Sequence, residues 1–177
     1  YLILLITTVS FGQTAEEYYS RGNTKQKLKD YEGAIADYTK AIKIIPNCKV
    51  YFNRGLAKFY LKDYYGAIAD HTKAININPI CAVVSYNMRG VAKVSLKDYE
   101  GAIADYTKSI NINPNYTNAY YNRGVAKERL KDYEGAVADY NKAININVND
   151  IKAYSNRGAV KERLKDYEGA IADYNKA

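Results

Sequence analysis

Small and apolar residues alternate with polar ones at helical spacing along two kinds of segment. In the stretch 133–147 the small and apolar positions fall three and four residues apart, at Ala136, Val137, Tyr140, Ala143 and Ile144. The preceding stretch 118–130 contains no Pro, is rich in helix-forming residues and follows the same period. Because this spacing places one face of a helix against a core, the pattern predicts two helices, named helix A and helix B.

The ends of both helices carry recognisable signals. An Asp precedes every helix B and can cap its exposed backbone N–H groups; these residues are Asp30, Asp63, Asp98, Asp132 and Asp166. Helix B ends where Pro46, Pro79 and Pro114 occur, because Pro cannot continue the hydrogen-bond ladder. The two helices therefore form an antiparallel hairpin.

The hairpin occurs five times. Measured between the glycines of helix A (Gly22, Gly55, Gly90, Gly124, Gly158), the steps are 33, 35, 34 and 34 residues. Such a period predicts an all-α fold, a right-handed α-solenoid in which each hairpin stacks on its neighbours. The predicted units are 15–47, 48–82, 83–116, 117–150 and 151–177. The last unit stops inside helix B, as expected for a piece of a longer protein.

The units resemble tetratricopeptide repeats. The family signature consists of an aromatic residue, Leu-Gly, Tyr, Ala, Phe and Pro. The fourth unit is similar to it, with Tyr120, Arg123-Gly124, Lys127, Ala136 and Tyr140 at the corresponding positions. In every copy Arg replaces the Leu and Lys replaces the Tyr, at slots that are partly buried in the family. An unpaired buried charge would be costly, so we expect the Arg to pair with a helix B Asp of its own copy. We also expect the helix A Gly to let helix A cross closely over the first Ala of helix B, as Gly124 over Ala136.

Composition adds little evidence for a nucleic-acid partner. The formal charge is +7, but 20 of the 26 Lys and Arg and 14 of the 19 acidic residues occupy recurring slots. The excess of six basic residues is thus a product of repetition and indicates a solvated scaffold surface. Binding of nucleic acid is not expected, although RNA or anionic glycans stay open as an alternative.

Residues 1–12 stand outside the repeats. This apolar, uncharged run is too short to span a bilayer, and Ser10 and Gly12 match the small residues of a signal-peptide cleavage site. We interpret it as a signal-peptide remnant and expect an exported protein, periplasmic or secreted, with no membrane span in the mature chain. Cys48 and Cys81 are expected to remain unpaired, because equivalent points on adjacent packed helices lie about 8–10 Å apart, beyond the reach of a disulfide.

No catalytic or metal-binding motif occurs. HExxH, GxSxG and phosphate-binding glycine loops are absent, the two cysteines match no metal spacing, and His71 replaces Tyr in a packing slot. We therefore expect no enzyme activity, no cofactor and no metal.

The resemblance implies a concave groove, lined by helix A, that holds extended peptides. The groove positions carried over from the family vary between copies: Tyr19, Asn23, Phe52, Asn53, Asn87, Tyr121, Asn122, Arg129, Asn156 and Arg163. We expect Asn53, Asn122 and Asn156 to form a sequence-tolerant ladder for a peptide backbone. Charged residues at the C-terminal end, including Glu128 and Arg163, could form a mixed-charge patch, or simply a solvated face.

The predicted function is a non-catalytic protein-interaction scaffold that binds a protein or peptide of unknown identity. The carboxylate clamp of some family members is not reproduced, because Val84 and Met88 stand where cations would be needed. An alternative is that the repeats are the interaction arm of a larger enzyme or sensor that continues beyond residue 177.

Overall fold

The computed structural model describes residues 13–177, which form ten α-helices and no strand. Residues 1–12, and with them the predicted signal segment, lie outside the described residues. The helices A are α1 (Ala15–Lys27), α3 (Cys48–Tyr60), α5 (Pro79–Ser95), α7 (Thr117–Arg129) and α9 (Ile151–Arg163). The helices B are α2 (Tyr31–Ile44), α4 (Tyr64–Ile77), α6 (Tyr99–Ile112), α8 (Tyr133–Ile146) and α10 (Tyr167–Tyr174).

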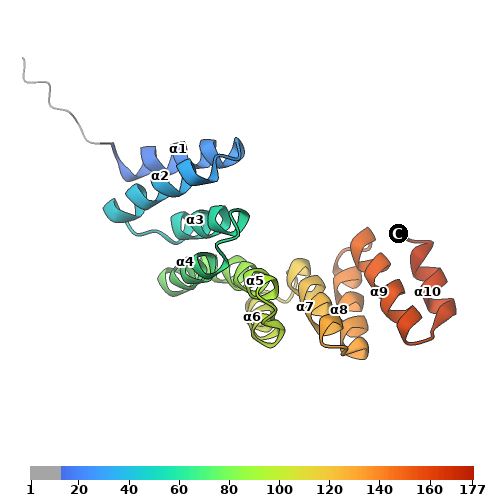
Figure 1. The fold of residues 1–177 in the computed structure, drawn as a ribbon. Helices are drawn as coiled ribbons and strands as arrows, with labels where there is room; N and C mark the ends of the chain where they lie inside the picture. Colours follow the sequence, from blue (N-terminus) through green and yellow to red (C-terminus); the bar gives the residue numbers. More distant parts are fainter. Residues whose placement is uncertain (1–12) are drawn as a thin grey trace, which may run out of the picture.

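The hairpins follow one another in chain order from the α1–α2 pair to the α9–α10 pair (Figure 1). Each helix packs on its sequence neighbours, and the buried residues form a series of small clusters along the array. This arrangement confirms the all-α solenoid that the 34-residue period predicts.

Each helix B begins with the predicted Asp cap. The side chain of Asp132, for example, accepts a hydrogen bond from the backbone N–H of Gly135 at 3.0 Å, and the same bond recurs in the other four copies. A Cβ at Gly135 would collide with the Asp132 carboxylate. The second recurring Gly is therefore required by the cap that precedes it.

The turn before the cap contains a feature that the sequence pattern did not reveal. The Lys of the LKD sequence adopts a left-handed conformation in every copy, with φ between 62° and 64°, at Lys29, Lys62, Lys97, Lys131 and Lys165. Its backbone N–H and that of the following Asp bond back to the last turn of helix A, as Lys131 and Asp132 do to Glu128 and Lys127. This is the usual way to end a helix, but with Lys in place of the favoured Gly.

The side chain nearest to the helix A Gly is the aromatic residue one turn beyond the first Ala of helix B, a contact that the predicted Gly–Ala crossing did not include. A Cβ at Gly124 would lie 2.8 Å from the ring of Tyr140, one turn further along helix B. The Gly makes room for this ring, which is fully buried in the same cluster as Ala136. In the second copy His71 takes the place of the Tyr against Gly55.

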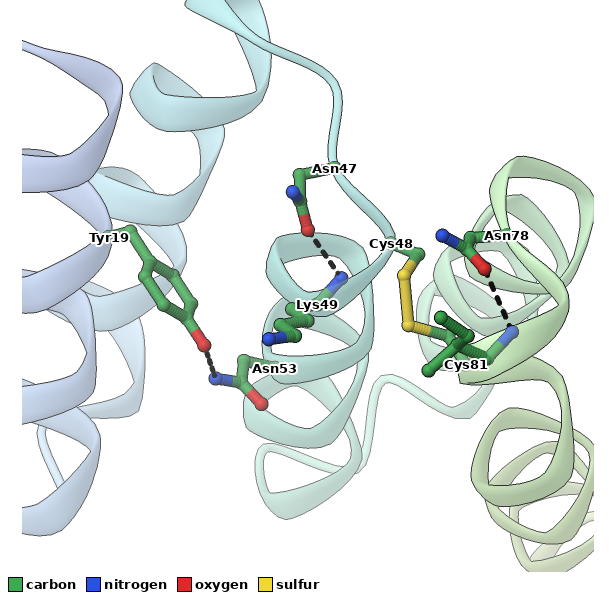
Figure 2. Close-up of a disulfide and its surroundings, with 8 residues drawn as sticks. Tyr19, Asn47, Cys48, Lys49, Asn53, Asn78 and Cys81 are labelled. Carbon is green, nitrogen blue, oxygen red and sulfur yellow. Dashed lines mark hydrogen bonds between the residues drawn. A yellow bond between two sulfur atoms is a disulfide. The ribbon is translucent and has the colours of Figure 1, made fainter.

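Cys48 and Cys81 form a disulfide, so the prediction of unpaired thiols is wrong (Figure 2). Their Cα atoms are 6.2 Å apart, within the range of a disulfide. The prediction assumed equivalent points on adjacent helices. However, α5 begins at Pro79 and has 17 residues, four more than α3, so Cys81 lies in an additional N-terminal turn that reaches the start of α3.

Candidate functional site

The five helices A form the inner wall of the array. Each helix A contacts the helix A of the next repeat, from α1 and α3 through to α7 and α9. Within residues 13–177 no helix B contacts another helix B. Closer packing on one side bends the stack toward that side, so the row α1, α3, α5, α7 and α9 lines a concave surface, called the groove strip below.

The Arg and Lys that depart from the family signature hold the two helices of each hairpin together. In the third repeat, Arg89 donates from Nε and Nη2 to the two carboxylate oxygens of Asp105, at 2.8 and 2.6 Å. Lys93 Nζ contacts the same carboxylate at 2.8 Å. All five copies form this Arg–Asp–Lys triad, which confirms the expected ion pair and adds the Lys to it.

The triad carboxylates are buried, and the pKa is lowered for those of Asp37, Asp105 and Asp173. Asp105 is only 2% exposed; burial acts to raise its pKa, but the hydrogen bonds from Arg89 and Lys93 lower the pKa below its usual range. At the N-terminal end, the hydrogen bond from Arg21 is the main reason that the pKa of Asp37 falls to about 2. Paired and bidentate, these charges are compatible with burial between the helices.

The same Arg also connects neighbouring repeats. Its Nη1 donates to a polar side chain on the helix B of the preceding repeat, through the pairs Arg54–Thr39, Arg89–Thr72, Arg123–Thr107 and Arg157–Asn141. The guanidinium also lies over the ring of a helix A Tyr three residues earlier, as Arg89 does over Tyr86 at 5.2 Å. One side chain thus contacts both the helix B of its own repeat and the helix B of the preceding repeat.

The three amides of the predicted Asn ladder each donate from Nδ2 to a side chain on the preceding helix A, so these N–H groups point along the array. Asn53 Nδ2 donates to the hydroxyl of Tyr19 at 3.2 Å and to Oδ1 of Asn23 at 2.9 Å, both on α1 (Figure 2 shows the Tyr19 bond). Both N–H groups of Asn53 are thereby occupied, and its Oδ1 is the group that can accept from a ligand.

Two further pairs repeat this arrangement. Asn122 donates to Asn87 Oδ1 at 3.0 Å, and Asn156 donates to the hydroxyl of Tyr121 at 3.0 Å. The structure therefore brings seven of the predicted residues together in three clusters, each bridging two helices A. The amide side chains therefore link the neighbouring helices A of the groove strip.

The other predicted residues have separate environments. Phe52 packs against His71, with ring centroids 5.3 Å apart, and burial lowers the pKa of His71 to about 4. Arg163 forms an ion pair with Glu128 of the previous repeat at 3.1 Å and lies over the ring of Tyr133. The expected mixed-charge patch is thus present at the C-terminal end, where Arg129 lies exposed at the end of α7.

A cavity between the first two repeats contains residues that the sequence reasoning missed. It has a volume of about 480 Å³ and lies between α1 and α3, next to the turns of their hairpins. Its lining consists of Asn23, Gln26, Lys27, Lys29, Tyr31, Asn53, Leu56 and Tyr60. The available signal was the alignment of the five copies, in which the second alone has Phe59 and Tyr60 after its Leu56.

Neither a metal centre nor a spanning helix emerges from the described part of the chain. Within residues 13–177, no three His, Cys, Asp or Glu side chains are grouped so that they could hold a metal ion. No helix in that range has the length and hydropathy needed to cross a bilayer.

Solved structures similar to this one share its solenoid. A crystal structure of MamA has a TM-score of 0.80 and 25% identity, covering 88% of this chain and 91% of that chain. MamA from Desulfovibrio magneticus RS-1 has a TM-score of 0.83 at 20% identity, covering 93% of both chains. YrrB, titled a TPR protein with an unusual peptide-binding site, has a TM-score of 0.72 at 19% identity and covers 92% of this chain and 84% of its own.

Sequence comparisons point to one family. No curated protein sequence matches the chain. Family profiles described as tetratricopeptide repeat match residues 15–48, 49–81, 117–150 and 151–177, and a profile described as TPR repeat matches 90–131. Together with the five hairpins and their concave inner wall, these matches establish that the chain belongs to the tetratricopeptide repeat family, whose fold is that of a protein-interaction scaffold.

Proposed function

We propose that the chain is a non-catalytic scaffold that binds an extended segment of a partner protein along the groove strip. The main support is the set of amides at Asn53, Asn122 and Asn156. Each is held by its Nδ2 to the neighbouring helix A, so its carbonyl oxygen has a fixed position. A row of fixed acceptors suits the backbone N–H groups of an extended chain, which every peptide sequence carries.

The variation between copies supports the same function. The triad residues and the Asp caps are the same in all five repeats, whereas the residues of the groove strip change from one helix A to the next. A scaffold that presents different side chains from identical hairpins can recognise a partner with a different residue at each step.

We also propose that the protein is exported. The signal-like character of residues 1–12 is one reason. The Cys48–Cys81 disulfide is a second, because disulfides persist in oxidising compartments such as the periplasm or the cell exterior. Analysis of the free-thiol content of protein isolated from the extracytoplasmic fraction, before and after reduction, tests this part of the proposal.

Site-specific photo-crosslinking in the native cell tests the proposed groove. A benzoylphenylalanine replaces Ser155 on the groove strip in one variant and the exposed Ala138 on α8 in the matched control. We expect a discrete adduct from position 155 and none from position 138. An adduct formed only from position 138, or equally from both, would contradict binding along the groove strip.

The same adducts separate a peptide partner from the alternative of RNA or anionic glycan. Treatment with protease, nuclease or glycosidase identifies the attached material directly. A nucleic-acid or glycan adduct would also lose yield steeply as salt increases, because charge neutralisation dominates such binding. Protease-sensitive adducts with weak salt dependence are the expected result.

A further inference from the structure

The second repeat differs from the other copies at three positions near its turn. Four residues after the helix A Gly it has Phe59, where the other copies have Gln, Val or Glu. Five residues after the Gly it has Tyr60 in place of Lys, Ser or Arg, and ten residues after it has Tyr65 in place of Glu. Phe59 and Tyr60 thus end α3 and Tyr65 lies in the first turn of α4, so the three aromatic replacements flank one turn.

Ring contacts hold Phe59 and Tyr60 in place, and Tyr60 remains accessible. The ring of Tyr60 stacks on Tyr31 of the first repeat, with centroids 4.8 Å apart and an angle of 14° between the planes. Phe59 packs against Tyr64 from the side, at 5.5 Å. Tyr60 is nevertheless 54% exposed, so a positioned aromatic surface faces the cavity between α1 and α3.

The equivalent place between the fourth and fifth repeats is occupied by the protein itself. There the counterpart of Tyr60 is Arg163, which lies over Tyr133 and forms an ion pair with Glu128. The counterpart of Glu128 in the first repeat is Gln26, a neutral residue. At the N-terminal end the local ion pair is therefore replaced by an amide, an aromatic ring and an open cavity.

The hydrogen bonds orient the amides of this cavity as donors. Asn23 Oδ1 accepts from Asn53 Nδ2 at 2.9 Å, and the Tyr38 hydroxyl lies 2.8 Å from Asn23 Oδ1 and 3.0 Å from Gln26 Oε1. With both carbonyl oxygens turned toward these partners, the NH₂ groups of Asn23 and Gln26 are left to donate to a ligand.

The charge of the lining also favours a ligand group that is negatively charged and accepts hydrogen bonds. Lys27 and Lys29 line the cavity, and no acidic residue does. Neither Lys takes part in any of the ion pairs formed within residues 13–177. The turn also fixes the backbone of Lys29, because its N–H bonds to the carbonyl of Gln26 at 3.0 Å.

We propose that this cavity is an anchor pocket for a partner segment in which a carboxylate side chain stands beside an aromatic or large apolar one. The carboxylate meets Lys27, Lys29 and the amide donors, while the apolar group packs on Leu56 and Tyr60. The volume of about 480 Å³ lies within the usual range for ligand sites. This inference rests on the proposed function, since the pocket opens on the groove strip, and it specifies the class of partner.

Nuclear magnetic resonance titration of the ¹⁵N-labelled chain with synthetic peptides tests the proposal. The probes are Gly/Ser decapeptides with Asp-Phe, Asn-Phe or Asp-Ala at their centre. We expect the Asp-Phe peptide to shift the amide signals of residues 23–31 and 53–60. Its binding should be about tenfold tighter than that of either other probe, the effect of one hydrogen-bonded charge or one buried ring.

Three variants sharpen the test. Lys29→Gln should weaken binding of the Asp-Phe peptide severalfold, and Tyr60→Arg, which installs the residue of the fifth repeat, should remove it. The matched control is Lys131→Gln, the same turn position in the fourth repeat, which should leave binding unchanged. Tyr60→Arg lies at an exposed position, and its helical circular dichroism will report whether the fold is retained.

The outcomes separate the pocket from the proposed function. Equal affinity for the Asp-Phe and Asn-Phe peptides, or equal effects of Lys29→Gln and Lys131→Gln, would overturn the anchor pocket. Shifts confined to α5, α7 and α9 would also overturn it, while leaving groove binding intact. If no probe shifts any signal of the groove strip and position 155 yields no photo-adduct, both proposals fail.

Discussion

The second repeat (α3 and α4) and the fourth repeat (α7 and α8) carry the same scaffold residues. Both have the Arg–Asp–Lys triad, and the side-chain exposures of Arg54 and Arg123 are 16% and 17%. Both have the Asp cap and a Lys in the left-handed conformation before it. The backbone of each hairpin is thus formed by the same interactions.

The two hairpins differ in several side chains that this scaffold carries. The second repeat has the buried His71 where the fourth has Tyr140, an aromatic edge where the fourth has Glu128 and Arg129, and a disulfide to the following repeat. The comparison indicates that the scaffold tolerates local replacements because each repeat contacts only its neighbours. Specialised roles are therefore expected at the positions where one repeat differs from the others, and stabilising roles at the positions that all repeats share.

The largest expected effect concerns a shared position. Asp70→Ala and Asp139→Ala each leave an Arg and a Lys without their buried carboxylate, and each should lower the free energy of unfolding by about 3–5 kcal/mol. Urea unfolding followed by circular dichroism measures both. Asp37→Ala is the graded control: Arg21 is 39% exposed, so the loss should be smaller. Losses below about 1 kcal/mol at Asp70 and Asp139 would refute a structural role for the triad.

The disulfide that joins the second repeat to the third is expected to have the next largest effect. Replacing Cys48 and Cys81 by Ser should lower the free energy of unfolding by about 2–4 kcal/mol, because the bond closes a loop across 33 residues of sequence. The wild-type protein in reductant should match the variant, and the variant should not respond to reductant. If reductant leaves the free energy of unfolding of the wild-type protein unchanged, the disulfide adds no stability.

His71→Tyr, which restores the residue of the other copies, should remove a pH dependence. The pKa of His71 is lowered from 6.5 to about 4 by burial, so the unfolded chain binds the proton more readily. Stability is therefore complete above pH 6.5 and falls as the pH drops toward 4, with a loss of about 2 kcal/mol at pH 5.

Thermal unfolding at pH 8, 6.5 and 5 measures this difference between wild type and variant. The triad carboxylate of Asp37 does not interfere: its pKa is lowered to about 2, so its stabilisation is retained down to about pH 4 and is lost below it. Parallel curves for the two proteins between pH 8 and 5 would contradict the assignment to His71.

The smallest expected effect again concerns a shared position. Lys62→Gly and Lys131→Gly should each raise stability by about 0.5–1 kcal/mol, because Gly adopts a positive φ without the steric cost that Lys incurs. The midpoints of thermal unfolding should rise equally in both variants. A fall in either would mean that the Lys side chain contributes more than its backbone conformation costs.

Much of the hairpin was predictable because its determinants are local. The Asp cap at Asp132 acts within a few residues and recurs in all five copies, and the Pro after helix B acts equally locally in three of them. The Arg123–Asp139 pair was also predictable, since the two residues recur together and a buried charge needs a partner. The Tyr140 contact of Gly124 was not predicted, because the helix crossing decides which turn of helix B faces the Gly.

Contacts between repeats were the least predictable. The disulfide depends on four additional residues at the start of α5, whose helical state the sequence pattern did not reveal. Asn122 Nδ2 donates to Asn87 Oδ1, which lies 35 residues away in the sequence. The anchor pocket is likewise lined by residues from three helices.

By itself, the sequence determined the helices, their caps, the pairing within each hairpin and the family of the protein. These features depend on spacings within one repeat, and those spacings recur in all five copies. Which side chains meet across neighbouring repeats depends on how the hairpins stack, and this stacking produces the disulfide, the direction of the Asn amides and the cavity at Tyr60. Such contacts depend on the angle and offset between stacked hairpins, which arise from packing along the whole interface and from no single residue.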